Sequence, residues 1–348
     1  MRVQLVDRPA DAFQQPVHAD VLARVCRRAL GDDVRVDAVV ELPWGSYNSV
    51  YRLDCEGRPP LVLRVAPAPG RPYRVENAMM RNEYAAVPYL APVGELLPRI
   101  LFADFTHQLV DRDFLVQTVL PGVPAPQAMG GWSRSRGAEL FAEIGAVTRR
   151  LHDVAGRAFG PVAGPGFATW SEALAEHLRT AALDVRDTGH DPRDVLALAA
   201  EAERHADALD EVRVPRLLHG DGWTANFLVD PRAGPVTVTG VCDFDRAEWG
   251  DPLADWGVQR ALLRPGTERD AFWEGYGQPR PEATGVRQLL YRARHAVALR
   301  LDLLRPGRTT LAGYATAESV ESVESVAGKV AATYDEVGGV LDRLGHTA

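Results

Sequence analysis

Two stretches, LLHGDGWTANFLVD (Leu217–Asp230) and VTGVCDFDRAEWGDPLADW (Val238–Trp256), decide the fold of this chain. Each contains short apolar runs that predict strands, with polar residues where a strand stops. In the first stretch Asp221 and Asn226 lie five positions apart on one loop, and in the second Asp243 follows an apolar run. If the strands form a hairpin, the oxygen-bearing side chains of these three residues converge on one point.

The rest of the chain changes character near residue 122. Residues 36–119 read as strands joined by turns of Gly, Ser and Asn, with one stretch of helical spacing at 77–90. From about residue 138 the pattern becomes helical, with one apolar stripe formed by Leu140, Ile144, Val147 and Leu151. We therefore predict an α+β fold of two lobes, a sheet lobe at 1–119 and a mostly helical lobe at 120–348.

Composition excludes several classes of protein. The 348 residues hold 39 Lys+Arg and 47 Asp+Glu, a net charge of -8, which disfavours nucleic acid as a partner. No apolar run approaches the roughly 20 residues that cross a bilayer, and charges occupy the N-terminus where a signal peptide would be apolar. We expect a cytoplasmic protein with no membrane contact. The oligomeric state cannot be predicted from this sequence.

Two residue types carry little functional information. The three cysteines, Cys26, Cys55 and Cys242, are far apart and odd in number, so we interpret them as core residues. Lys329 is the only lysine, so arginine must fill any position that normally holds a functional lysine.

The spacing of Asp221, Asn226 and Asp243 suits phosphoryl transfer. That reaction needs a carboxylate near the attacking hydroxyl and oxygen ligands that hold Mg²⁺ against the phosphates of a nucleotide. Gly, Asp and Asn are also ordinary turn residues, so the loop alone would more often be structural. The second acid-rich strand end, at Asp243, favours the functional interpretation.

These residues resemble the aminoglycoside phosphotransferase and choline kinase family, small-molecule relatives of the protein kinases. The HGDxxxxN loop is matched from His219 to Asn226, the DFD segment at 243–245, and the continuation GDPLADW at 250–256. The resemblance covers about residues 36–300 and implies a protein-kinase-like fold with an antiparallel sheet in the N-terminal lobe. It implies that Asp221 is the catalytic base or orients the hydroxyl, and that Asn226 and Asp243 bind Mg²⁺.

The resemblance extends to a phosphate-covering loop. PWGSYNSVYR (Pro43–Arg52) is similar to the family's loop between the first two strands, where backbone N–H groups approach the phosphates. Ser46, Tyr47 and Asn48 are therefore candidate contacts to ATP or GTP. An ordinary hairpin turn would look the same.

Two further parts of the N-terminal half resemble nucleotide-binding elements. Arg64 stands where many kinases carry a phosphate-pairing lysine, and Glu83 occupies the place of its ion-pair partner on the following helix. The alternative is that Arg64 is a surface strand residue. FLVQTVLPG (Phe114–Gly122) resembles the strand and hinge between lobes, where backbone groups from Gln117 to Val119 would meet the adenine edge.

No sequence motif identifies the acceptor, but the distribution of charge bears on its chemical class. Between residues 171 and 211 there are eleven acids and four arginines, which leaves -7. A wall of this sign would favour a cationic acceptor such as an amino sugar or a basic peptide antibiotic, although charged helices mostly face water. Candidate contacts to the acceptor, all near the end of the DFD strand, are Asp245, Glu248, Trp249 and Trp256, of which the tryptophans are also common core residues.

From these residues we expect a phosphotransferase that moves the γ-phosphate of ATP or GTP to a hydroxyl of a small molecule, such as an antibiotic. A metabolic kinase for choline, a sugar or an amino-alcohol would use the same core residues. A third hypothesis is a nucleotide-binding pseudokinase that acts as a scaffold. The presence of Asp221, Asn226 and Asp243 argues against it.

Overall fold

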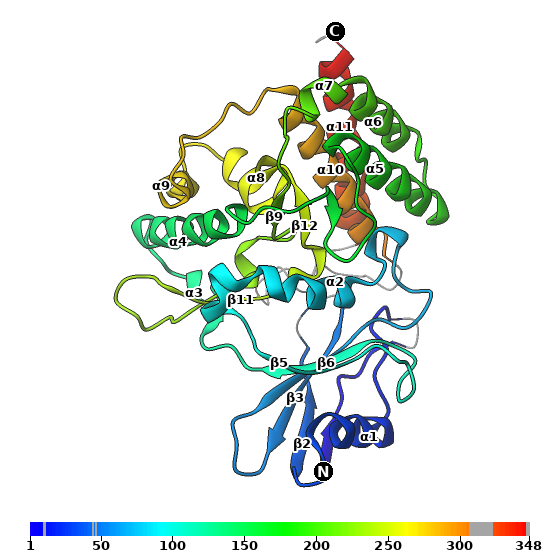
Figure 1. Cartoon of the computed structure of the whole chain (residues 1–348), viewed down its shortest axis with the longest axis vertical. Helices are drawn as coiled ribbons and strands as arrows, with labels where there is room; N and C mark the ends of the chain where they lie inside the picture. The colour runs from blue at the N-terminus through cyan, green and yellow to red at the C-terminus, as the bar shows by residue number, and fades with distance from the viewer. Residues whose placement is uncertain (10–11, 44, 46, 306–322, 346–348) are drawn as a thin grey trace. The chain divides into compact units, whose positions relative to one another are not determined.

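The computed structural model describes residues 1–9, 12–43, 45, 47–305 and 323–345, and the chain forms two compact units (Figure 1). Unit 1 comprises Met1–Tyr73, Pro98–Leu120 and Arg305–Val326. Unit 2 comprises Arg74–Leu97, Pro121–Leu304 and Ala327–Ala348. None of the described helices combines the length and the apolar character that crossing a bilayer would need.

Unit 1 is built on a six-stranded sheet with the order β1-β2-β3-β4-β6-β5. Its strands are β1 (Arg2–Gln4), β2 (Val36–Glu41), β3 (Ser49–Cys55), β4 (Leu61–Val65), β5 (Ile100–Asp104) and β6 (Phe114–Thr118). Neighbouring strands from β2 to β5 run antiparallel, which confirms the predicted sheet, and β1 adds a parallel edge. The alternating pattern of β3 buries one face, because successive side chains point to opposite sides.

Helix α1 (Ala19–Leu30) supplies the other half of the core of unit 1, and Figure 1 shows it beside the sheet. Leu22, Val25 and Cys26 of α1 share one buried cluster with Leu53 and Leu63 of the sheet. Burial of Cys26 and of Cys55 confirms that these two cysteines are core residues. Cys242, by contrast, is only half-buried.

Unit 2 is mainly helical, as predicted. Its helices are α2 (Met79–Ala86), α3 (Ala125–Met129), α4 (Arg134–His152), α5 (Trp170–Asp187), α6 (Arg193–Arg204), α7 (Ala206–Leu209), α8 (Trp256–Leu262), α9 (Ala271–Tyr276), α10 (Val286–Leu303) and α11 (Val323–Gly345), whose first residues belong to unit 1. Its 3₁₀ helices are η1 (Arg74–Glu76), η2 (Val87–Tyr89), η3 (Ala91–Leu96), η4 (Thr224–Asn226), η5 (Phe244–Arg246), η6 (Pro252–Ala254) and η7 (Glu268–Asp270). The capping box of Thr169 and Glu172 shows why α5 begins at Trp170.

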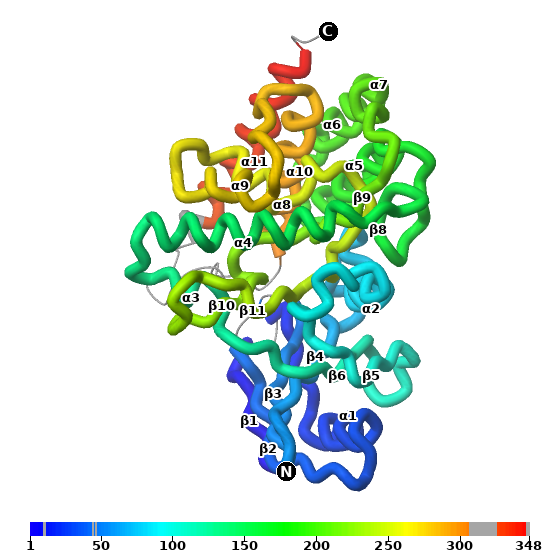
Figure 2. The backbone as a smooth tube through the Cα atoms, turned by 60° about the vertical axis from the view of Figure 1, so that its left-hand side comes forward, coloured from blue at the N-terminus to red at the C-terminus, as the bar shows by residue number. Residues whose placement is uncertain are grey.

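Helix α4 runs through unit 2 and packs closely on α9 (Figure 2). A Cβ at Gly275 of α9 would collide with the carbonyl oxygen of Ala142 in α4, so only glycine allows this approach. Helix α4 contributes Leu140, Ile144, Val147 and Leu151 to the main buried cluster of the unit, as the sequence pattern predicts.

Two small sheets complete unit 2. One has the order β11-β10-β7, from β7 (Val123–Pro124), β10 (Phe227–Val229) and β11 (Val238–Val241). The other has the order β8-β12-β9, from β8 (Gly160–Pro161), β9 (Arg216–Leu218) and β12 (Glu248–Gly250). The predicted hairpin is β10 and β11, which pair antiparallel with Phe227 opposite Val241.

Candidate active site

The loop that carries Asp221 follows β9 directly. Gly220 has φ +79°, and a Cβ there would collide with the backbone carbonyl of Arg246, so the turn into Asp221 requires glycine. His219 is buried and accepts a 3.3 Å hydrogen bond at Nδ1 from the N–H of Asp221. Burial lowers the pKa of His219, so the ring stays neutral and braces the loop.

The β10–β11 hairpin brings Asn226 and Asp243 to the same end of the sheet. The backbone N–H of Cys242 donates to the carbonyl of Asn226 at 3.0 Å, one step beyond the Phe227–Val241 pair. Asp243 follows with φ 62° and ψ 56°, a left-handed conformation that few residues other than glycine adopt. Strain of this kind concentrates at functional sites.

The side chain of Asn226 is also hydrogen-bonded to Asp221. Its Nδ2 donates to the carbonyl oxygen of Asp221 at 2.9 Å and to the carboxylate Oδ2 at 3.1 Å. These bonds hold the Asp221 side chain in place and engage the nitrogen end of the amide. The amide oxygen of Asn226 is the end that could bind a cation.

The carboxyl of Asp221 has an unusually high affinity for a proton. Burial raises its pKa from 3.8 to about 7, opposed by the positive charge of Arg246, and the negative charge of Asp243 raises it further. A carboxylate with a pKa near neutral pH suits a general base.

Three residues around this cluster were not found from the sequence. The Arg246 guanidinium pairs with Glu76 at 3.1 Å, and Glu76 is almost completely buried. Asn82 on α2 donates to the carbonyls of Asp245 and Ala247 at 3.0 and 2.8 Å. Glu76 and Asn82 thus hold the segment after Asp243 from more than 160 positions away in the chain. Arg246 lies in the DFDR segment and could have been noticed there; for Glu76 and Asn82 the sequence holds no local signal.

The buried carboxylate of Asp255 is hydrogen-bonded to the backbone of the catalytic loop. Asp255 accepts hydrogen bonds from the N–H groups of His219 (2.9 Å) and Gly220 (3.2 Å), and its Oδ2 lies 3.0 Å from Nε2 of His152. The Nδ1 of His152 in turn lies 2.8 Å from the hydroxyl of Tyr276. Burial alone would raise the pKa of Asp255, but the His152 bond and the other partners lower it to about 2. The position of the loop therefore depends on Asp255, which the sequence did not single out.

The donor set at the end of the hairpin fits magnesium. Mg²⁺ prefers oxygen ligands and is commonly held by one or two protein groups, phosphates and water. Asp243 offers a carboxylate and Asn226 an amide oxygen at the same end of β10 and β11. Among the described residues no cluster of three or more His, Cys, Asp or Glu could hold a metal by itself.

All the residues predicted for the nucleotide site except Glu83 belong to unit 1. Asn48 and Gln117 are buried, and within the described structure the side-chain oxygen of each has no hydrogen-bond partner. Gln117 lies in β6 between β4 and β5, whereas Val119 follows the strand and is 46% exposed. Tyr47 is half-buried. Ser46 lies outside the described residues.

Arg64 and Glu83 are both buried, but they belong to different units. Arg64 on β4 is 4% exposed, which rules out the alternative of a surface strand residue. Glu83 lies on α2 in unit 2 and is 5% exposed. Their ion pair stays a prediction.

The predicted acceptor contacts lie near the cluster in sequence but differ in environment. Glu248 pairs with Arg294 at 2.8 Å. Trp249 is buried and packs edge-on against Tyr89 with ring centroids 4.9 Å apart, so its burial gives no support to an acceptor contact. Asp245 is buried as well.

Trp256 is the most accessible of these aromatic candidates. It opens α8, is half-buried, and packs edge-on against His295 with ring centroids 4.6 Å apart. Its contact with an acceptor stays a prediction.

The acidic segment at 171–211 has its carboxylates largely engaged. Asp184 is buried and accepts three hydrogen bonds from Arg74 and Val75, and Asp194 binds the buried guanidinium of Arg300 at 2.6 and 2.9 Å. Further acids of the segment with partners are Asp187 (Arg74), Asp191 (Arg193), Glu201 (Arg204), Asp210 (Ser171) and Glu211 (Arg287).

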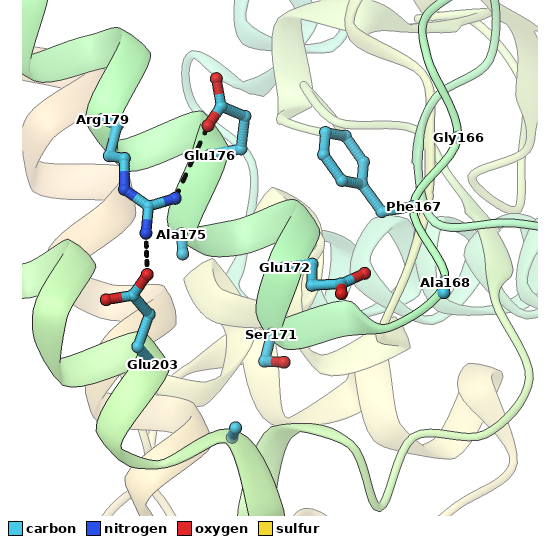
Figure 3. A pocket seen from close by; sticks show the side chains of 10 residues that line it. Gly166, Phe167, Ala168, Ser171, Glu172, Ala175, Glu176, Arg179 and Glu203 are labelled. Atoms are coloured by element: carbon cyan, nitrogen blue, oxygen red, sulfur yellow. Dashed lines mark ion pairs between the residues drawn. The ribbon is translucent and has the colours of Figure 1, made fainter.

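A surface pocket of about 540 Å³ lies on this same segment (Figure 3). Glu176 and Glu203 project into it from α5 and α6, and both are paired with Arg179. Its lining residues are Gly166, Phe167, Ala168, Ser171, Glu172, Ala175, Glu176, Arg179, Glu203 and Ala206, and they do not include Asp221, Asn226 or Asp243.

Comparison with known proteins identifies the family of this chain. The model of the phosphotransferase enzyme family (APH) matches residues 38–289, so the chain belongs to this family. The match includes the whole Asp221–Asn226–Asp243 cluster. A comparison with curated proteins found no match.

Solved structures of the same fold are distant in sequence. A thermostable mutant of aminoglycoside phosphotransferase APH(4)-Ia, in a ternary complex with AMP-PNP and hygromycin B, is 16% identical, with a TM-score of 0.61 and coverage of 92% of this chain and 97% of that chain. Aminoglycoside 2'-phosphotransferase-IIIa with GDP is 16% identical, with a TM-score of 0.58 and coverage of 91% and 97%. LicA with AMP is 11% identical, with a TM-score of 0.58 and coverage of 92% and 98%. The predicted protein-kinase-like fold is confirmed.

Proposed function

We propose that this protein transfers the γ-phosphate of a nucleoside triphosphate to a hydroxyl of a small molecule, and that the acceptor is an antibiotic. The observation that carries the proposal is the cluster at the end of the β10–β11 hairpin. There Asp221 is hydrogen-bonded to Asn226 and close enough to Asp243 for the charge of that residue to raise its pKa. Membership of the phosphotransferase family supports the reaction class.

In the proposed reaction Asp221 accepts or orients the proton of the acceptor hydroxyl. The hydroxyl oxygen forms a bond to the γ-phosphorus, the bond from that phosphorus to the bridging oxygen breaks, and the nucleoside diphosphate leaves. Arg246, beside Asp221, favours the charged form of this carboxylate, and Asn226 holds its orientation. Asp255 keeps the loop backbone in place through His219 and Gly220.

Asn226 and Asp243 would hold Mg²⁺, and bound Mg²⁺ would neutralise negative charge on the phosphates. In unit 1, Tyr47, Asn48, Arg64, Gln117 and Val119 would contact ATP or GTP. The nucleotide complexes of the similar structures support this assignment.

An antibiotic acceptor is supported by the complex of APH(4)-Ia with hygromycin B. We extend the proposal to a cationic acceptor, for which Asp245 is the candidate carboxylate contact. The proposed setting is the cytoplasm.

A screen of acceptors tests the proposal. Purified protein with Mg²⁺ and either ATP or GTP is offered aminoglycosides, basic peptide antibiotics, choline, sugars and amino-alcohols, and nucleoside diphosphate release is measured. Mass spectrometry of the product then shows whether one phosphoryl group was added. Acceptor-dependent turnover with an antibiotic supports the full proposal, and turnover only with a metabolite supports the metabolic kinase. Nucleotide binding without turnover on any acceptor would contradict the proposal and support the pseudokinase hypothesis.

A further inference from the structure

An arginine that follows α10 is enclosed by aromatic rings in unit 1. Arg305 is 5% exposed. Its guanidinium carbon lies 4.3 Å from the ring centroid of Phe13, 5.2 Å from that of Tyr73 and 5.5 Å from that of Tyr47. We call these three rings the aromatic cage. A buried guanidinium over aromatic faces is a strong form of the cation–π interaction.

The rings of the aromatic cage come from three separate parts of the chain. Phe13 precedes α1, Tyr47 lies in the loop between β2 and β3, and Tyr73 is the last residue of its stretch of unit 1. Phe13 and Tyr47 also contact each other, with ring centroids 5.6 Å apart. Arg305 therefore joins the loop between β2 and β3 to two segments outside it.

The segment around Phe13 is itself bonded to that loop. The side-chain amide of Gln14 donates to the carbonyl of Asn48 at 2.7 Å. The carbonyl of Gln15 accepts from Ser49 Oγ at 3.3 Å and from Arg112 Nη1 at 2.9 Å. Gln14 and Gln15 thus bind Asn48, at the end of the loop, and Ser49, the first residue of β3.

We propose that Arg305 is a positioning residue for the nucleotide, which acts through Tyr47 to hold Tyr47 and Asn48 where the phosphates would bind. Phe13 and Arg305 lie outside the residues matched by the family model, at 38–289, whereas Tyr47 and Tyr73 lie inside them. Asn48, next to Tyr47, has a buried side-chain oxygen without a partner among the described residues, which a correctly placed loop could present to a ligand. The inference rests on the proposed function of this loop in binding ATP or GTP.

Kinetics of Arg305→Met test the inference, because methionine keeps an apolar stem and removes the cation. We expect the nucleotide KM, and the Kd for ATP or GTP measured by calorimetry, to rise about tenfold. The kcat and the acceptor KM should change less than about twofold, since Asp221 is untouched. Arg305→Lys should recover part of the affinity, because it restores a cation without the planar group.

The matched control is Arg28→Met. Arg28 also lies over an aromatic ring of unit 1, that of Phe102 at 5.9 Å, but it is an exposed residue of α1 and not part of the aromatic cage. This variant should leave the nucleotide KM unchanged. An equal rise in both variants would indicate general loosening of unit 1 and would overturn the proposal.

A second variant keeps the test valid if Arg305→Met does not fold. Tyr47→Leu should raise the nucleotide KM, Tyr47→Phe should not, and combining Tyr47→Leu with Arg305→Met should add little to either single change. Hydrogen exchange of a peptide covering residues 42–52 should be faster in Tyr47→Leu and in Arg305→Met.

The outcomes separate the two proposals. If the unaltered protein neither binds nor consumes nucleotide, the proposed function fails, and the positioning role fails with it. If the unaltered protein is active and the Arg305 and Tyr47 variants keep its nucleotide KM, only the positioning role is wrong. Fully additive effects of Arg305→Met and Tyr47→Leu would also overturn it.

Discussion

The catalytic loop at 217–226 and the acidic segment at 171–211 are both rich in polar residues, but the structure uses them differently. In the loop, Asp221, Asn226 and the nearby Asp243 meet at one end of a hairpin, and burial raises the pKa of Asp221 to about 7. In the acidic segment, most carboxylates accept hydrogen bonds or form ion pairs with arginines, as Asp184 does with Arg74.

The difference between the loop and the acidic segment shows that the net charge of a stretch of sequence does not by itself predict a binding site. The net charge of -7 between residues 171 and 211 is a sum along the chain. The electrostatic field at a site depends instead on all the charged groups near it, including those from distant parts of the chain. Arg74 and Arg300, which neutralise Asp184 and Asp194, lie outside the segment. The spacing of Asp221 and Asn226 is a better guide because both belong to one short loop.

The largest effect is expected for Asp221→Asn. Removing a general base while keeping the shape of the side chain should lower kcat by about 10²–10⁴-fold, with nucleotide binding preserved. Single-turnover kinetics with a saturating acceptor measure it. Asp230→Asn, an exposed turn residue after β10, is the control and should keep full activity. If the Asp221→Asn variant catalyses the reaction at a near-normal rate, the assignment of Asp221 as the general base is wrong.

A smaller effect is expected for Asp243→Asn. The loss of one anionic oxygen ligand should raise the Mg²⁺ concentration that gives half-maximal activity by about tenfold or more. Activity titrated against Mg²⁺ measures this, with Asp207→Asn on the exposed face of α7 as the control. An unchanged titration curve for Asp243→Asn would show that the metal is held elsewhere.

Asp255→Asn tests whether the catalytic loop depends on its buried support. The pKa of Asp255 is about 2 in the folded chain and 3.8 in its reference state, so the carboxylate stabilises the fold by about 2 kcal/mol. This contribution is present above pH 4 and is lost as the pH falls toward 2. The variant should therefore be less stable at pH 7 and show a flatter decline in acid, measured by denaturant unfolding across pH.

The same Asp207→Asn variant serves as the control for that experiment and should retain the acid dependence of the unaltered protein. An Asp255→Asn protein with unchanged stability at pH 7 would mean that the bonds to His219 and Gly220 do not hold the loop.

The smallest effect is expected from the double change Asp187→Asn and Asp191→Asn in the acidic segment. Both side chains are about half exposed and already paired, with Arg74 and Arg193. The acceptor KM and its dependence on salt should not change, because exposed pairs contribute little and are screened. A higher KM for a cationic acceptor, abolished at high salt, would instead show that this segment attracts the acceptor.

The sequence by itself determined the antiparallel sheet, the helical half and the convergence of Asp221, Asn226 and Asp243. Each depends on local information: alternation of apolar residues, a three- to four-residue stripe, and a hairpin that joins two nearby strands. The same locality explains why the pairing of Phe227 with Val241 could be expected.

Only the tertiary structure decided which distant groups support these elements. Asp255 reaches His219 across 36 positions, Glu76 reaches Arg246 across 170, and Arg305 enters a cage that begins at Phe13. No periodicity or spacing encodes such pairs, because they form where packing of the core happens to bring separate segments together. Burial then gives each pair its strength, by removing the water that would otherwise compete for the same polar groups.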